Sequence, residues 1–111
     1  MNLKLIKILP LFLLISGCVS NAQIDKMNNG TNAALGKPLT GLINVIGDPH
    51  ETIQIGDRQR LTWITPHNIR PCKLIVFIDN KGIMRRTGWD GYVGACKIFG
   101  DKLTEYAKTQ N

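Results

Sequence analysis

The side chains best suited to chemistry in this sequence are the thiols of its three cysteines, Cys18, Cys72 and Cys96. A thiol can form a disulfide, bind a metal, exchange electrons or carry a lipid. Cys72 and Cys96 do not form a Cys-x-x-Cys motif, and the nearest histidine, His67, lies five residues before Cys72. This spacing disfavours a metal site or a redox pair, and both stay open as alternatives to a disulfide. Disulfides persist in oxidising compartments, so the use of these cysteines depends on where the protein resides.

The first 17 residues have the pattern of a secretory signal peptide. Lys4 and Lys7 precede an almost continuous apolar run over residues 8–14, and small residues follow. A basic start, an apolar centre and a small-residue cleavage site direct a chain to export. Residues 8–17 are too few to cross a bilayer, because a membrane-spanning helix needs about 20 residues. We therefore predict export; the alternative is a cytosolic protein with an apolar start.

The end of this stretch, Ile15-Ser16-Gly17-Cys18, resembles the lipobox of bacterial lipoproteins. The resemblance implies cleavage before Cys18, lipid on its sulfur and acylation of the new N-terminus. It also implies a bacterial envelope protein attached to a membrane through Cys18. Val19 replaces the Asp that usually retains enterobacterial lipoproteins in the inner membrane, so we expect the periplasmic face of the outer membrane. The alternative is an ordinary signal peptide with an incidental cysteine.

In an exported protein, Cys72 and Cys96 are expected to form a disulfide. The bond would close a loop of 25 residues counting both ends, which stabilises a fold by roughly 3–4 kcal/mol. Cleavage before Cys18 leaves 94 of the 111 residues. A domain of that size buries only about 60–65% of its unfolded surface, so a disulfide would supply a large share of its stability.

The expected mature chain is mildly basic and divides into two parts. Two of the 14 Lys and Arg residues and none of the eight acids precede Cys18, which leaves a net charge of +4. The basic residues are scattered, with Arg85-Arg86 the only adjacent pair, so we expect no nucleic-acid partner. Residues 18–33 are polar and rich in Asn, which predicts a lipidated flexible tether. Residues 34–111 then form a single small domain.

The hydrophobic pattern of residues 34–111 predicts an α+β fold. A short helix, an antiparallel meander of three to four strands and a C-terminal helix form two layers with one disulfide. The apolar run 74–78 implies a strand buried on both faces or central in the sheet. Its hairpin partner ends near Cys96, which brings Cys96 beside Cys72. The expected helices are 38–46 and 95–108, and the expected strands are 52–57, 61–65, 73–79 and 83–89.

No set of side chains in the sequence suits catalysis. His50 and His67 lie in loops beside proline, and the aspartates lie at turns or helix starts. The sequence has no phosphate-binding loop, nucleophile elbow or metal-ligand spacing. We therefore expect a non-catalytic protein without a cofactor or metal. Trp63 and Trp89 are expected to pack in the core or on a face of the sheet rather than to form a ligand platform.

One segment could carry a partner-binding patch, because aromatic and Arg side chains dominate interface energetics. Its candidate residues are Trp89, Tyr92, Arg85 and Arg86. Strict alternation along 83–89 would place Arg85 and Trp89 on one face of the sheet and Arg86 on the other. For Trp89, partner binding is the alternative to the packing expected above.

Several short motifs resemble the SmpA/OmlA (BamE-like) superfamily of small bacterial lipoproteins. The resemblance implies the α+β fold and a role in outer-membrane assembly or integrity through an envelope protein partner. The sequence lacks the Gly-Met-Thr segment with which the helix of BamE begins. We expect it also to lack the second N-terminal helix of BamE. Cys72 and Cys96 also have no counterpart there. The similar residues are Gly36-Lys37-Pro38, Gly47-Asp48-Pro49, Trp63, Cys72, Phe77-Ile78-Asp79 with Gly82, and Cys96.

Two functions from different classes follow from these observations. The first is a non-catalytic, lipid-anchored envelope protein that binds another envelope protein in outer-membrane assembly or integrity. The alternative is a periplasmic inhibitor or small ligand-binding module tethered to the membrane. Identification of the partner separates the two, because the first predicts membrane-assembly components and the second a soluble enzyme or a small molecule.

Replacing Cys18 tests the lipid anchor. We expect Cys18→Ser to leave the precursor uncleaved and unlabelled by radioactive palmitate, because the substitution removes the sulfur that carries the lipid. Gel mobility and autoradiography of labelled cells measure both effects. Normal labelling of the variant would show that the lipid is attached elsewhere.

Overall fold

A computed structural model describes residues 22–66 and 69–110 of the chain. The expected signal peptide, Cys18 and His67 lie outside these residues. A helix over 22–34 precedes α2 (Leu39–Ile46), the strands β1 (Glu51–Ile55), β2 (Arg58–Ile64), β3 (Cys72–Ile78) and β4 (Met84–Gly91), the 3₁₀ helix η1 (Val93–Cys96) and α3 (Lys97–Thr109). The predicted α+β class, meander and C-terminal helix are confirmed. No helix among the described residues has the length and hydrophobicity to cross a bilayer.

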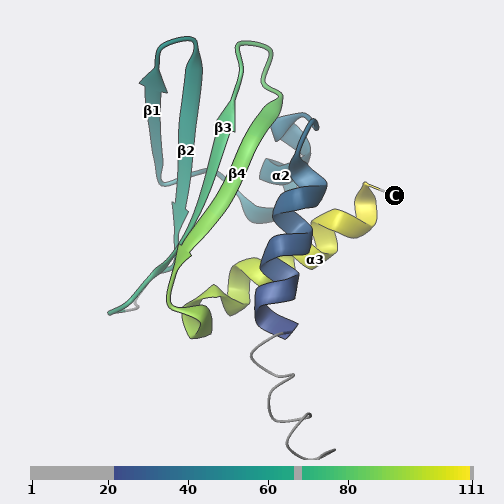
Figure 1. Ribbon diagram of the computed structural model, residues 1–111, viewed down its shortest axis with the longest axis vertical. Helices are drawn as coiled ribbons and strands as arrows, with labels where there is room; N and C mark the ends of the chain where they lie inside the picture. Colours follow the sequence, from purple (N-terminus) through teal and green to yellow (C-terminus); the bar gives the residue numbers. More distant parts are fainter. Residues whose placement is uncertain (1–21, 67–68, 111) are drawn as a thin grey trace, which may run out of the picture.

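The four strands form one antiparallel sheet in sequence order, β1-β2-β3-β4 (Figure 1). β3 lies between β2 and β4, as its apolar sequence predicts. The face of β3 that carries Cys72, Leu74, Val76 and Ile78 is fully buried under the helices. The opposite face is not, because Ile75 and Phe77 are half-buried there and Lys73 is exposed.

α2 begins and ends where the sequence predicts. Pro38 has an extended backbone and precedes the first helical residue. Gly47 follows the last one with φ of 88°, and its N–H donates to the Ile43 carbonyl oxygen at 2.8 Å. Glycine adopts this left-handed conformation without steric penalty. The helix therefore ends before Pro49, from which the chain continues into β1.

The core lies between the covered face of the sheet and the helices. The Trp63 indole N–H donates to the Gly47 carbonyl oxygen at 2.9 Å, which ties β2 to the end of α2. Burial raises the pKa of the Tyr106 hydroxyl, which has no hydrogen-bond partner among the described residues. The largest fully buried side chains are Trp63, Tyr106, Met27, Leu42, Leu74, Met84, Leu103, Val76, Cys72 and Cys96.

The expected flexible tether is wrong for residues 22–33, which form a helix packed against α3 (Figure 1). Met27 is fully buried, and a Cβ atom at Gly30 would overlap the side chain of Leu103. At the start of the helix, Lys26 lies 3.1 Å from the carboxylate of Asp101. The domain therefore includes these residues, and a helix does precede α2, contrary to expectation. Burial of one face against α3 stabilises a helix that its composition does not favour.

The predicted disulfide is present between Cys72 and Cys96, whose Cα atoms lie 5.1 Å apart. It joins the first residue of β3 to the last residue of η1. Gly91 makes this approach possible, because it has φ of 125° and a Cβ there would overlap the Pro71 carbonyl oxygen. The end of β4 can thus lie against the start of β3 before the chain turns into η1.

Gly30→Ala tests whether helix 22–34 belongs to the core. The added methyl group would overlap Leu103, so we expect unfolding to become easier by about 1–3 kcal/mol. Gly41→Ala is the matched control, because a Cβ there would lie 3.6 Å from the Tyr106 ring, an ordinary contact. Its better helix propensity gives no loss, or a gain of about 0.5–1 kcal/mol. Urea denaturation measures both variants; equal midpoints for Gly30→Ala and the unmodified protein would contradict the packing.

Candidate binding surface

The four residues expected to form a binding patch do not lie together. Trp89 pairs with Leu74 across the β3–β4 ladder and therefore points to the covered face of the sheet. It is half-buried against the core, and its indole N–H donates to the Asn28 side-chain oxygen at 2.9 Å. Trp89 thus attaches helix 22–34 to β4, which is the packing role expected for it from the sequence.

Arg85 lies at an irregularity in the β3–β4 ladder. Ile78 pairs with Met84 and Phe77 with Arg86, so Arg85 has no opposite residue. Strict alternation therefore fails here, and the register assigns Arg85 to neither face of the sheet. Its Nε donates to the Asp79 carboxylate at 2.9 Å. That bond is the main cause of the lowered pKa of Asp79, about 2, and the Ile83 N–H adds to it.

Arg86 and Tyr92 are exposed and lie on different parts of the surface. The Arg86 guanidinium lies 5.8 Å from the centre of the Phe77 ring, on the face of the sheet away from the helices. Tyr92 follows β4 and is 56% exposed, with the Arg70 guanidinium 5.7 Å from its ring centre. Partner binding by these residues stays a prediction.

The uncovered face of the sheet, called the open face here, combines apolar and basic side chains. One row across it runs Ile53, Arg60, Phe77 and Arg86, with each residue paired to the next. Four cations and two acids share this face. By register, its members are Glu51, Ile53 and Ile55 of β1, Arg58, Arg60, Thr62 and Ile64 of β2, Lys73, Ile75 and Phe77 of β3, and Arg86, Gly88 and Asp90 of β4.

β1 forms an edge of the sheet, and every one of its residues is exposed. Ile53 and Ile55 are 37% and 47% exposed on the open face. The Glu51 carboxylate lies 3.6 Å from the Arg60 guanidinium, so it offsets one of the cations. An edge strand presents backbone N–H and C=O groups that can pair with another chain. In the sequence, the alternation of Ile53 and Ile55 predicts a strand; it is also the signal that could have indicated this surface.

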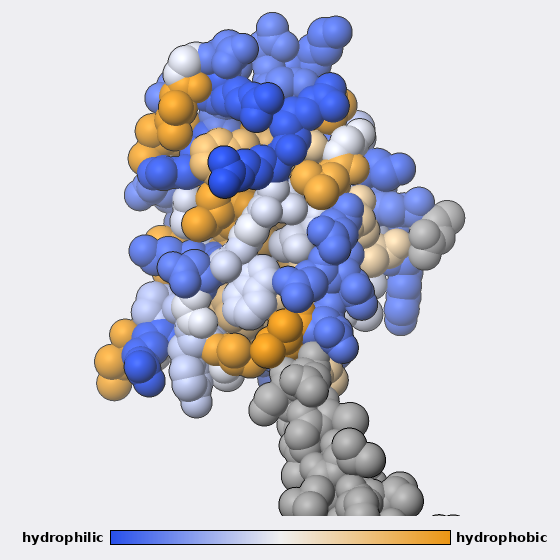
Figure 2. Space-filling model, in the orientation of Figure 1, coloured by the Kyte–Doolittle hydropathy of each residue, from blue (hydrophilic) through white to orange (hydrophobic). Residues whose placement is uncertain are grey.

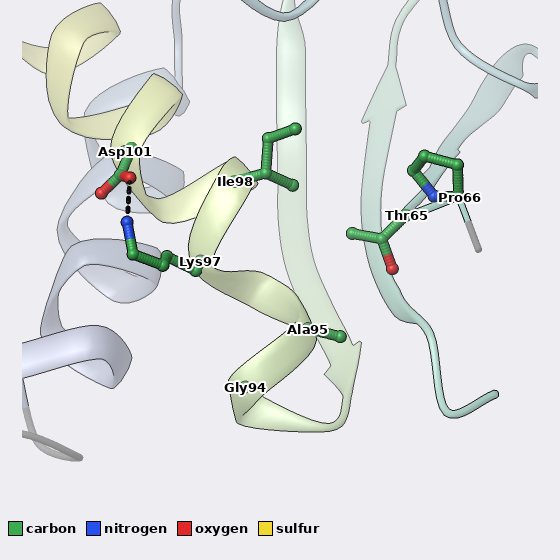
Figure 3. Close-up of a pocket in the computed structure, with 7 residues that line it drawn as sticks. All are labelled: Thr65, Pro66, Gly94, Ala95, Lys97, Ile98 and Asp101. Carbon is green, nitrogen blue, oxygen red and sulfur yellow. Dashed lines mark hydrogen bonds and ion pairs between the residues drawn. The ribbon is translucent and has the colours of Figure 1, made fainter. Parts of the chain in front are cut away.

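Two open hollows lie beside η1, and neither gathers groups suited to catalysis. Figure 3 shows the first, of about 440 Å³, with Ile98 and Ala95 facing Thr65 and Pro66. The Lys97–Asp101 ion pair lies to one side, and its hydrogen bond lowers the pKa of Asp101, with a second contribution from Lys26. The second hollow, of about 630 Å³, is lined by Arg70, Pro71, Lys73, Asp90, Gly91, Tyr92 and Val93.

Histidine and carboxylate side chains in the described residues are separated. No group of three or more His, Cys, Asp or Glu residues there could hold a metal ion. His50 accepts a hydrogen bond from the Ile64 N–H at 3.0 Å through Nδ1, so it joins the start of β1 to the end of β2. That contact gives His50 a structural role.

Compared with known proteins, the chain matches no family model, no curated protein and no solved structure.

Separate substitutions of the two aromatic residues distinguish packing from surface. We expect Trp89→Ala to lower the free energy of unfolding by about 2 kcal/mol or more, because the side chain packs on the core. Tyr92→Ala should change it by no more than about 0.5 kcal/mol, since Tyr92 is exposed. Thermal denaturation followed by circular dichroism measures both. Equal losses would mean that Tyr92 also supports the fold.

Proposed function

We propose that this protein is a non-catalytic lipoprotein of the bacterial outer membrane that binds another envelope protein in membrane assembly or integrity. The lipobox-like end of the leader supports a lipid on Cys18 and a position on the periplasmic face. The buried Cys72–Cys96 disulfide fits an oxidising compartment. Two helices before the sheet also fit the resemblance to the SmpA/OmlA (BamE-like) superfamily.

The open face with its β1 edge is the observation that carries the binding role. A monomeric domain gains nothing from exposing Ile53 and Ile55 on an unprotected edge, whereas a partner strand would cover both. Phe77 and Ile75 continue the apolar surface across the sheet. An extended segment that pairs with β1 would gain backbone hydrogen bonds and side-chain contacts together.

The charges of the open face indicate the chemistry of that segment. Arg58, Arg60, Lys73 and Arg86 outnumber Glu51 and Asp90. Complementary charge speeds association and disfavours wrong partners. The partner segment is therefore extended and acidic, with apolar residues at alternate positions.

Site-specific photocrosslinking in living cells tests this role. A photoreactive amino acid at Ile53 or Phe77 should capture an envelope protein, identified by mass spectrometry as a membrane-assembly component. The same group at Glu105, exposed on α3, is the matched control and should capture little. Combining Arg60→Glu with Arg86→Glu should reduce capture at Ile53, because it reverses the charge next to the partner.

The identity of the captured protein also decides between the two functional classes. A soluble hydrolase or toxin bound at Ile53 would favour the tethered inhibitor. Capture at Glu105 alone would move the binding surface to the helices and overturn the role of the open face.

A further inference from the structure

We propose that the end of the domain around η1 rests on the membrane that holds the Cys18 lipid, in the layer of lipid headgroups. The contact would fix how the domain stands on the bilayer. The inference rests on the proposed lipid anchor and is independent of the partner of the open face. We call this region the anchor-end surface, and its residues are Ile69, Arg70, Tyr92, Lys97 and Ile98.

Chain length places this end of the domain close to the lipid. Three residues separate Cys18 from Ala22, the first described residue of the helix over 22–34. A chain spans at most about 3.6 Å per residue, so the Cα atoms of Cys18 and Ala22 are no more than ~14 Å apart. The flexible tether of 16 residues that the sequence predicted would not have kept the domain this close to Cys18. The helix therefore holds its own N-terminal end near the bilayer.

The anchor-end surface lies at that same end of the domain. In Figure 1 the start of the helix over 22–34, η1 and the connection between β2 and β3 all lie at the lower end. Contacts agree with the view, because Gln23 lies against Gly100 and Lys26 pairs with Asp101 in the second turn of α3. The turns β1–β2 and β3–β4 lie at the opposite end, away from the membrane.

Apolar and aromatic side chains are exposed at this end of the domain. Ile69 is fully exposed at 101%, Tyr92 is 56% exposed and Ile98 is 47% exposed. They are three of the six large exposed hydrophobic residues in the described chain. Figure 2 shows hydrophobic surface at the lower end, at the tip of the lobe on the left and next to the grey trace.

The mixture of side chains suits the boundary between headgroups and acyl chains. Apolar residues insert into this layer, and tyrosine places its ring there with its hydroxyl toward water. Arg70 lies over the Tyr92 ring, and Lys97 is 73% exposed while paired to Asp101. Both cations can reach lipid phosphates from the protein surface. A protein partner at this end would have to fit between the domain and the bilayer. The space for it is small, because the Cα atom of the lipid-bearing Cys18 is at most ~14 Å from that of Ala22.

Lipid-borne quenchers test the contact on the full lipidated protein. It is placed in vesicles of phosphatidylethanolamine and phosphatidylglycerol, with an NBD fluorophore on a single added thiol in Ile69→Cys or Ile98→Cys. Asp57→Cys and Lys81→Cys, in the turns at the opposite end, are the matched controls. A non-reduced digest confirms that Cys72 and Cys96 remain paired, and intact mass confirms the lipid.

Doxyl-labelled phospholipid should remove most NBD emission at positions 69 and 98 and little at 57 and 81. Equal quenching at both ends of a lipidated protein would overturn the proposed surface and leave the anchor standing. A blue shift at 69 and 98 without lipid quenching would mean that another protein surface, such as a second copy, covers them, which also overturns the proposal. Cys18 without lipid in the intact mass would overturn the anchor and the surface together.

Discussion

The covalent link between Cys72 and Cys96 determines where the last helix, α3, can begin. It holds the end of η1 against the first residue of β3, so α3 starts beside β3 and continues against α2 and the helix over 22–34. Gly91 permits the link by letting β4 approach Pro71 more closely than a side chain would allow. Since helix 22–34 packs on α3, its position also depends on this link.

Local sequence patterns predict those elements whose backbone conformation is set by their own residues. Pro38 and Gly47 mark the ends of α2 because each fixes a backbone conformation, whatever surrounds it. Short turns between segments of alternating hydrophobicity predict the meander. The meander in turn predicts the disulfide, because it brings Cys96 beside Cys72. Helix 22–34 differs because its buried stripe includes Gly30 and Ala34, which carry little apolar surface. Its stability comes from contacts with α3 and β4, between about 55 and 75 positions further on, and no local pattern contains those contacts.

The candidate surfaces show a second limit of local patterns. Alternation predicts which residues of a strand share a face, but coverage of that face depends on how far the helices extend. Ile53 and Trp63 both occupy apolar positions in predicted strands, yet Trp63 is buried and Ile53 is exposed. The irregularity at Arg85 also interrupts the alternation of β4, so the pairing that alternation predicts for Arg85 is not present. Exposure of Ile69 and Ile98 likewise depends on the fold, because both sequence positions could equally be buried.

The packing of the first described helix on the last gives this small domain a particular order of completion. In a chain made from its N-terminus, residues 22–34 are complete well before the 97–109 segment that they contact. The hairpins can form earlier because their contacts are local. The packing of Gly30 against Leu103 and the ion pair of Lys26 with Asp101 form only when the last helix is present. The N-terminal helix is therefore the first element to be made and among the last to find its complete set of contacts.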